Sequence, residues 1–431
     1  MPIIHLVMRA KIILFLVLII SFAVLPLRAE ESLTWKQCVS EAQQAHPDLF
    51  SALALLQQAE AEKRITEGSL LPQLSLGASS QQNGTTEKGI AASSVTSFSL
   101  SADQLLYDGH KTSNQVASNA EAIKAARYNY SAVSANVRFA LRSAYTQLLL
   151  AQDLVALTVE IAERRQKNVR LINLYYQGGK EHIGSLHQAQ ADLAQAEFEV
   201  SQAGRGLALA QTRLASALGR DIHNPLMVQG SYRASDLSVG KPDLALLAKN
   251  NPLFQQLDTK SKAARYALDV AKSTFSPQLY LTSSVGRSSP DRWPFNAVDW
   301  RAGFTLSVPI YEGGSGRGRV SKAMAVLSQQ NAQEKSGYLQ IFDNLEQNWK
   351  NFQDARRMVV VQKKQLDAAT DRSSIANAQY SNGLVKFNDW VIIENNLVGA
   401  KKSYLNAEAN LLIAEAQWIQ VKGGGLDDQQ E

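Results

Sequence analysis

A glycine-rich segment, Gly313–Gly318, has the composition of a loop that cradles phosphate groups. It reads Gly-Gly-Ser-Gly-Arg-Gly, and it follows an expected strand and precedes an expected helix, as nucleotide-binding loops do. It lacks the Lys-Ser or Lys-Thr ending of such loops, and its counterpart Asp108–Lys111 lacks the run of glycines. The segment is therefore predicted to be a flexible joint between strand and helix rather than a nucleotide site.

Histidine and cysteine are the other residues that could bind a metal or act as nucleophiles. His182 and His187 are five positions apart, which does not place both on one helix face, and no acidic partner recurs near them. Cys38 is the only cysteine, so it forms no intramolecular disulfide, and we expect a buried small residue on the first helix. With no Ser/His/Asp constellation in view, the sequence predicts no enzyme, no cofactor and no metal site.

The N-terminus has the pattern of an export signal. Arg9 and Lys11 precede the apolar run 12–24, and Ala29 is a small residue at an expected cleavage point, so residues 1–29 are predicted to be a signal peptide. The alternative is a retained membrane anchor, although the run is shorter than the roughly 20 residues that a spanning helix needs.

The charge balance excludes one class of partner. The formal net charge is +5 for the whole chain. It falls to about +2 without residues 1–29, because Arg9, Lys11 and Arg28 leave with them. No cluster of Lys and Arg with interleaved aromatics remains, so we expect no nucleic-acid binding.

The chain repeats itself with an offset of 204 or 205 residues. The landmarks that recur are a proline before a strand, a tyrosine after a strand pair and a tyrosine near a helix break: Pro72 and Pro277, Tyr107 and Tyr311, Tyr176 and Tyr380. Such self-similarity predicts two copies of one structural unit. The predicted divisions are a first repeat at 30–223, a linker at 224–242, a second repeat at 243–423 and a C-terminal tail at 424–431.

Each repeat is expected to contain a helix, two strands and a long helical hairpin. In the first repeat a helix is expected over about 33–70, where Pro72 stops it. From Ser113 to Leu174 there is neither proline nor glycine, and apolar residues recur in a coiled-coil pattern with seven-residue spacing. About 60 residues give roughly 90 Å of helix, which must pack against other long helices. The hairpins are predicted at 111–219 and 317–422.

The strands alternate between apolar and polar residues. They are predicted at about 73–83, 95–106, 278–287 and 299–310, with Trp300, Ala302 and Phe304 on one face and Arg301 and Thr305 on the other. No second layer is evident to cover the apolar face, so a barrel with its apolar face toward lipid fits better than a soluble sheet. Four strands are fewer than the roughly 8 of the smallest barrels, so this interpretation requires two or three chains.

Together these features resemble the TolC-type outer-membrane efflux proteins. The residues that support the resemblance occur in order along 33–423: Leu33-Thr34-Trp35, His46-Pro47, Leu71-Pro72-Gln73-Leu74, the Tyr-x-x-Gly pairs Tyr176/Gly179 and Tyr380/Gly383, Asn251-Pro252, Ser276-Pro277-Gln278-Leu279 and Tyr311-Glu312-Gly313-Gly314. The resemblance implies a mainly α fold with a small β part. It implies a homotrimer with a twelve-stranded outer-membrane β-barrel continuous with a twelve-helix α-barrel tunnel.

The same resemblance implies partners and site residues. The partners would be outer-membrane lipid, a periplasmic adaptor protein and an inner-membrane pump, and the chain would be a passive exit duct. The tips that contact the adaptor would include Gly178, Gly179, Lys180, Asn382, Gly383 and Leu384. A ring of acidic residues would line the closed end, with Asp389 in the first position; Ile392 takes the second, and Glu394 could substitute for it. The gate arginine of the family is absent, since Val385 and Glu181 stand at the two matching positions.

Two alternatives remain open on the residues alone. Asp389 could cap the return helix together with Asn388, since both are good N-cap types. Long helical hairpins would also suit a periplasmic coiled-coil adaptor or scaffold protein, although an adaptor needs compact β domains with more strands. The sequence does not indicate the cargo or the class of pump.

Overall fold

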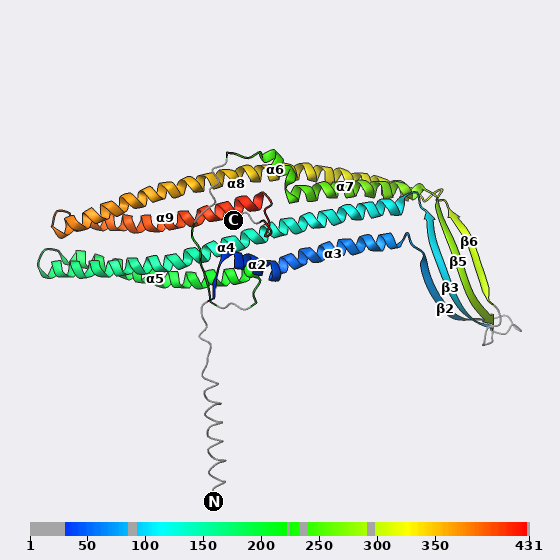
Figure 1. Ribbon diagram of the computed structural model, residues 1–431, viewed down its shortest axis with the longest axis horizontal. Helices are drawn as coiled ribbons and strands as arrows, with labels where there is room; N and C mark the ends of the chain where they lie inside the picture. The colour runs from blue at the N-terminus through cyan, green and yellow to red at the C-terminus, as the bar shows by residue number, and fades with distance from the viewer. Residues whose placement is uncertain (1–30, 85–92, 222–224, 233–239, 291–297, 429–431) are drawn as a thin grey trace, which may run out of the picture. The chain divides into compact units, whose positions relative to one another are not determined.

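The computed structural model describes residues 31–84, 93–221, 225–232, 240–290 and 298–428. The predicted signal peptide at 1–29 lies outside these ranges, as do residues 224 and 233–239 of the predicted linker at 224–242. Within them the chain is mostly helical with a small sheet (Figure 1). None of the described helices is both long enough and apolar enough to cross a membrane.

The helix expected over 33–70 is interrupted at a proline. A three-residue strand β1 (Glu31–Leu33) comes first, followed by α2 (Trp35–Ala45) and α3 (Pro47–Gly68). Pro47 lacks an N–H, so it suits a first helical position, and the His46 side chain accepts a hydrogen bond from the Asp48 N–H at 3.2 Å. Cys38 is fully buried on α2, as expected.

The second repeat has the same interruption. Helix α6 (Leu244–Asn250) ends before Pro252, and α7 (Pro252–Lys272) begins there and continues into the short 3-10 turn η1 (Ser273–Phe275). Here the Asn251 side chain is the cap, because its Oδ1 accepts from the Leu253 N–H at 2.9 Å. Its Nδ2 donates to the Val421 carbonyl at 2.8 Å, which joins the start of α7 to the end of the last helix.

Four strands form one antiparallel sheet in the order β2-β3-β5-β6, so each repeat supplies a neighbouring pair. Their bounds are β2 (Gln73–Asn83), β3 (Ser93–Tyr107), β5 (Gln278–Pro290) and β6 (Asp299–Ser307). Strand β6 is shorter than the predicted 299–310; Pro309, which lacks a backbone N–H, lies just beyond its end. Strands β2 and β6 are the two edges of this sheet.

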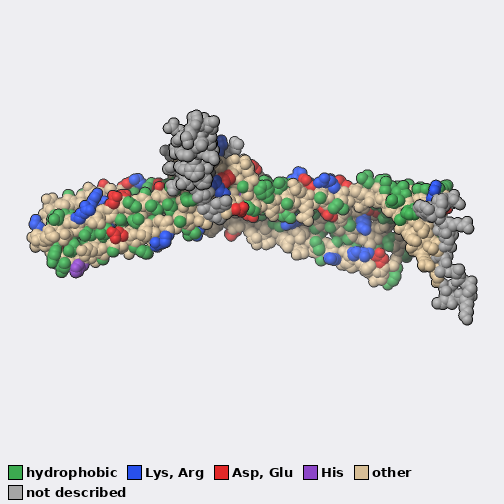
Figure 2. Space-filling model, turned by 90° about the horizontal axis from the view of Figure 1, so that it is seen from below, with side chains coloured by type: hydrophobic (Ala, Val, Ile, Leu, Met, Phe, Trp, Pro, Cys, Tyr) green, Lys and Arg blue, Asp and Glu red, His purple; other side chains and the backbone are tan. Residues whose placement is uncertain are grey.

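The long hairpins consist of a helix of 67 residues and a return helix about half as long. The first is α4 (Lys111–Gln177) with α5 (Ile183–Leu218), and the second is α8 (Ser315–Ser381) with α9 (Phe387–Val421). A helix of this length extends for roughly 100 Å. On the face that Figure 2 shows, acidic and basic side chains are interspersed with apolar and uncharged polar ones.

The chain forms two compact units, and each draws on both repeats. The first unit comprises residues up to 45, 141–233 and 359–410, and includes the tips of both hairpins. A short parallel pairing of β1 with β4 (Leu226–Val228) also lies in this unit. The Gln152 side chain supports it, accepting from the Val228 N–H at 2.9 Å and donating to the Val228 carbonyl at 3.1 Å.

The second unit contains the four-stranded sheet and the helices next to it. It comprises residues 46–140, 234–358 and 411 to the C-terminus. Its core lies between α6, α8 and α9, where Leu244, Leu345, Phe352 and Trp418 are almost fully buried. The Trp349 and Trp418 rings, with centroids 5.2 Å apart, close this core.

Candidate functional site

One face of the four-stranded sheet is apolar and open to its surroundings. The strand register places Leu76, Leu100, Val285 and Trp300 in one row across all four strands. Leu281 and Phe304 share a second row of this face. These side chains are exposed, with 80% of Leu76 and 76% of Trp300 accessible. Exposure of this much contiguous apolar surface marks a contact with lipid or another protein.

The opposite face is built from small hydroxyl residues and glycine. Ser75 and Ser101 are hydrogen-bonded across β2 and β3 at 2.7 Å, and Ser79 and Ser97 do the same at 2.8 Å. The charged residues that the register places on this face of the described strands are Asp103, Asp299 and Arg301. A sheet with one apolar face and one polar face, both exposed, has the alternation of a membrane barrel wall.

All four junctions between strands and helices lie at the same end of the four strands. The register pairs Gln73 with Asp103, and Gln278 with Ser307, so the starts of β2 and β5 lie beside the ends of β3 and β6. At the opposite end of the strands, β2 and β5 end and β3 and β6 begin. The long helices therefore leave the sheet from one side only.

The glycine-rich segment forms one of these junctions. Gly313 and Gly314 both have positive φ, 61° and 86°, just before α8 begins. In the first repeat Gly109 and His110 have φ of 66° and 63°, so the same left-handed pair recurs with a histidine in the second place. The preceding acidic residue acts as a cap in the first repeat, where Asp108 Oδ2 accepts from the Thr112 N–H at 2.8 Å. This geometry explains Gly313 and Gly314 without a ligand, whereas Gly316 and Gly318 lie inside α8.

The hairpin tips end their long helices in the same way. Gly179 and Gly383 have φ of 71° and 74°, and the residue after each glycine donates its N–H back to a carbonyl five positions earlier. These bonds are Lys180 to Tyr175 at 2.8 Å and Leu384 to Gln379 at 2.9 Å. This is the Schellman arrangement, which requires a left-handed residue and so explains the glycine of each Tyr-x-x-Gly pair.

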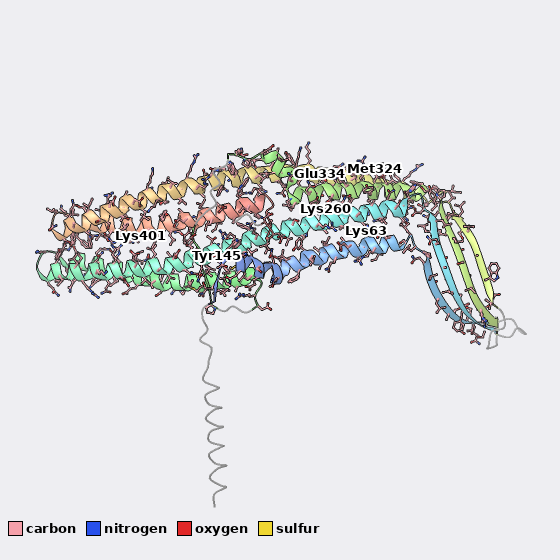
Figure 3. All side chains as sticks on the ribbon, in the orientation of Figure 1. Lys63, Tyr145, Lys260, Met324, Glu334 and Lys401 are labelled. Atoms are coloured by element: carbon pink, nitrogen blue, oxygen red, sulfur yellow. The ribbon has the colours of Figure 1, made fainter. Side chains whose placement is uncertain are left out.

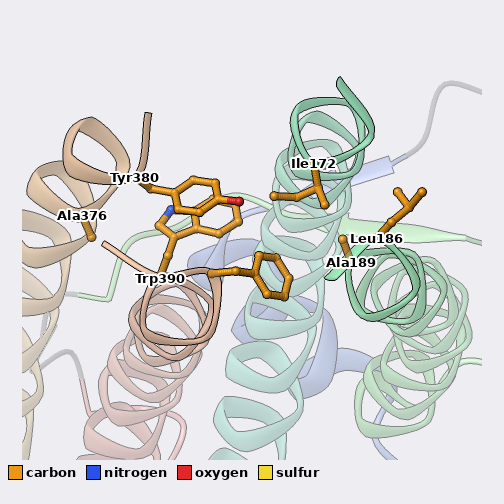
Figure 4. Packing of buried hydrophobic residues seen from close by; sticks show 7 residues of the cluster. Ile172, Leu186, Ala189, Ala376, Tyr380 and Trp390 are labelled. Carbon is orange, nitrogen blue, oxygen red and sulfur yellow. The ribbon is translucent and has the colours of Figure 1, made fainter. Parts of the chain in front are cut away.

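The two tyrosines of these pairs have different surroundings. Tyr176 is 40% exposed, whereas Tyr380 is 4% exposed and stacks on Trp390 with ring centroids 4.6 Å apart (Figure 4). The Tyr380 hydroxyl donates to Glu181 of the other hairpin at 2.9 Å. Burial and this hydrogen bond raise the pKa of Tyr380. Ile172, Leu186 and Ala189 complete the cluster from the first hairpin.

Glu394 lies inside this packing. It is 2% exposed, and its carboxylate accepts from Arg164 Nε at 2.6 Å and Nη2 at 3.0 Å. Ser373 and Asn377 of α8 donate to the same carboxylate at 2.5 and 3.2 Å. In this position Glu394 joins α4, α8 and α9 and does not present its charge to solvent, which differs from the pore-lining position suggested by the sequence.

Further ion pairs connect the two hairpins along their length. Lys401 of α9, which is labelled in Figure 3, pairs with Glu160 of α4. The next residue, Lys402, pairs with Glu199 of α5 at 2.6 Å. These pairs and the buried cluster place both hairpin tips side by side in the first unit.

The other predicted tip residues are on the surface. Asp389 is exposed in the first turn of α9, which begins at Phe387, so it lies three residues after the N-cap position. An acidic residue there still stabilises the start of the helix through its dipole. Gly178, Lys180 and Asn382 are exposed, and Leu384 is 75% exposed.

The histidines do not form a ligand set. His182 precedes α5 and its Nδ1 accepts from the Ser185 N–H at 3.3 Å, which makes it a helix cap. Across the described ranges no group of three or more His, Cys, Asp and Glu side chains is arranged to hold a metal ion.

Comparison with known proteins identifies the family. The family model "Outer membrane efflux protein" matches twice, at residues 38–220 and 244–424. The cation efflux system protein CusC of Escherichia coli (strain K12) is 24% identical over 414 residues, which cover 90% of this chain and 86% of CusC. Nodulation protein T of Rhizobium leguminosarum bv. trifolii is 24% identical over 388 residues, which cover 87% and 80% of the two chains.

Solved structures share the fold. A crystal structure of CusC superposes with a TM-score of 0.83 at 20% identity, and the match covers 90% of this chain and 92% of the other. The resemblance predicted from the sequence motifs is thus confirmed. With a family model matched in both halves, the chain belongs to the outer membrane efflux protein family, whose members are transport channels of the outer membrane.

Proposed function

We propose that this protein is the passive outer-membrane exit duct of a tripartite efflux or type I secretion system, and that it works as a homotrimer. The observation that supports this most strongly is the sheet with one apolar and one polar face, both exposed, and two unpaired edges. Pairing β6 of one copy with β2 of the next would satisfy both edges. Three copies then give twelve strands in a closed barrel with lipid outside and water inside.

The long helices support the same assembly. Several large apolar side chains of α8 are exposed, among them Leu339 at 58%, Val360 at 58% and Ile375 at 57%. A second copy of the chain is the natural cover, because trimerisation brings α8 against a neighbouring hairpin. Twelve helices would then enclose a tunnel continuous with the barrel.

All strand–helix junctions lie at one end of the strands, and this gives the proposed orientation of the protein in the membrane. If the sheet spans the outer membrane, all helices extend to one side, and an exported chain places them in the periplasm. The hairpin tips would then point toward the inner membrane. Their exposed residues, Lys180, Asn382 and Leu384, are the proposed contacts for a periplasmic adaptor that connects the duct to an inner-membrane pump.

The tip also contains the proposed selectivity element. Asp389 is exposed near the tip, and three symmetric copies would form a negative ring that favours cations. Asp389→Ala should lower cation selectivity and cation block in single-channel recordings, whereas unchanged values would leave only a role in stabilising α9. Glu394, buried against Arg164, is not part of the proposed ring.

The cargo does not follow from the duct itself. The relatives are named for cation efflux and for nodulation. The polar face of the sheet offers hydroxyl groups and few charges to a solute. We infer that the pump selects the cargo and that the duct transmits it.

Fractionation of cells that produce the full chain tests this proposal. The protein should be found in the outer-membrane fraction and run as a trimer on gels without heating and as a monomer after heating. A monomer in the soluble periplasm would overturn the proposal and favour the adaptor or scaffold alternative.

A further inference from the structure

Arg287 is the one charged side chain that the strand register places on the apolar face of the described sheet. It lies on β5, directly opposite Phe98 of β3, which in turn pairs with Ala78 of β2. The next row toward the helices consists of Leu76, Leu100, Val285 and Trp300. A ligand that binds at this place would therefore contact apolar side chains and a cation at the same time.

Arg287 is close to the end of β5 that is farther from the helices. It lies eight positions from Leu279, where the apolar residues of β5 begin, or about 27 Å along the strand. At a strand tilt of about 40° this is roughly 20 Å of membrane depth, close to the height of the apolar band in outer-membrane barrels. In the proposed orientation the guanidinium therefore lies at the external boundary of the lipid layer.

An open hollow on the same face has Arg287 among its lining residues. Leu76, Phe98, Leu100 and Val285 line it, together with Val298 and Arg287 itself. The lining is almost wholly apolar, and the hollow opens on the surface that would contact lipid. A hollow of this kind suits an acyl chain, and Arg287, the one charged residue of its lining, suits a phosphate.

On these grounds we propose that the hollow and Arg287 bind a phosphorylated glycolipid of the lipid A type from the outer leaflet, with an acyl chain along the hollow and a phosphate on the guanidinium. The proposal rests on the proposed function, because only a membrane-spanning sheet brings this face to the outer leaflet. The positive charge of Arg287 favours an anionic headgroup. A phosphate suits it well, because a guanidinium forms paired hydrogen bonds with phosphate oxygens.

Arg301 supplies a matched control. It is an exposed arginine on the neighbouring strand β6, paired with Ser284, and the register places it on the opposite, polar face. Arg287→Gln and Arg301→Gln therefore remove the same charge from two faces of one sheet. Arg287→Lys keeps the charge and loses the paired geometry.

The experiment is a titration of the full-length purified protein in neutral detergent with diphosphoryl lipid A, with the bound lipid counted by native mass spectrometry. Arg287→Gln should weaken lipid A binding roughly tenfold, as expected for loss of a charge-assisted pair, and Arg287→Lys should weaken it less. Arg301→Gln should bind like the unchanged protein. Phosphatidylglycerol should compete poorly.

Four results would overturn the proposal. The first three are no binding of lipid A, equal binding by Arg287→Gln, and equal loss in Arg301→Gln. The fourth is equal competition by phosphatidylglycerol, because the site would then recognise any anionic lipid. Unheated gels of the same samples report the trimer separately. If the unchanged protein forms no trimer, the proposed duct is wrong. If Arg287→Gln forms trimers and binds lipid A as well as the unchanged protein, only the proposed lipid site is wrong.

Discussion

Replacing Arg164 by methionine tests whether the buried carboxylate of Glu394 depends on its cation. Glu394 is 2% exposed, whereas Arg164 is 33% exposed, so the two partners are not equivalent. Without Arg164 the carboxylate stays buried with Ser373 and Asn377 as its remaining donors. Without the Glu394 charge, the guanidinium can turn toward water.

The magnitude follows from this asymmetry. Removing one partner of a fully buried ion pair costs about 3–5 kcal/mol, and the remaining donors together with the partial exposure of Arg164 reduce this to about 2 kcal/mol for Arg164→Met. Glu394→Gln keeps an acceptor and a donor in place and should cost about 1 kcal/mol. The double variant should be more stable than Arg164→Met alone, because no unpaired charge remains buried.

Hydrogen exchange of the backbone amides in 373–397 measures the free energy of local opening at this end of the hairpins. Arg164→Met should raise the opening constant by roughly thirtyfold, since each 1.4 kcal/mol is a factor of ten. Equal effects of the two single variants, or additive effects in the double variant, would refute the reasoning. An Arg170→Met variant, farther along α4, provides the control for loss of a cation.

Three further predictions follow from the sheet and the tips. Val285→Arg lies on the apolar face, two residues from Arg287 and so near the lipid boundary, and should cost about 1–2 kcal/mol of membrane stability and reduce the amount in the outer membrane, whereas Ser284→Arg on the polar face should not. Equal losses measured by fractionation would contradict the assignment of faces. Gly179→Ala should destabilise its tip by about 1 kcal/mol, because φ is 71°, and the neighbouring Gly178→Ala should not, as hydrogen exchange at the tip would report. The folded protein raises the pKa of Tyr380, so the contribution of this hydroxyl to stability is present below its unfolded pKa and is lost as pH rises above about 10. In Tyr380→Phe the free energy of unfolding should therefore fall less steeply at alkaline pH. An unchanged pH dependence in urea titrations at pH 9 to 11 would contradict the role of this hydroxyl.

Local pattern indicated the strands and long helices because their signals are strong. The alternation along 73–83 corresponds to β2, and the uninterrupted run from Ser113 lies in α4. The β1 and β4 pairing had no such signal, since each strand has three residues and the partners are far apart in sequence. A one-residue interruption such as that at His46, before Pro47, is also hard to distinguish from a helix end.

The interior of the tips was less predictable than their turns. Gly179 and Gly383 follow from helix-ending rules, and the sequence named them. Glu394 was suggested as a substitute for Ile392 in a pore-lining acidic ring, because the partner that buries it, Arg164, lies 230 positions away and no local pattern indicates it. The signal available was that Glu394 directly follows the apolar run Trp390–Ile393. A carboxylate buried beside such a run requires a buried cation or a functional reason.

Disulfide cross-linking between the two sheet edges tests the central claim most directly. In a Cys38→Ser background, a cysteine at Leu76 of β2 is combined in turn with one at Trp300, Ala302 or Phe304 of β6, all of which the register places on the apolar face. The account predicts that one of these combinations gives a covalent ladder that ends at three chains in the outer membrane. Absence of a ladder in every combination, or a ladder that continues beyond three, would contradict a closed trimeric barrel.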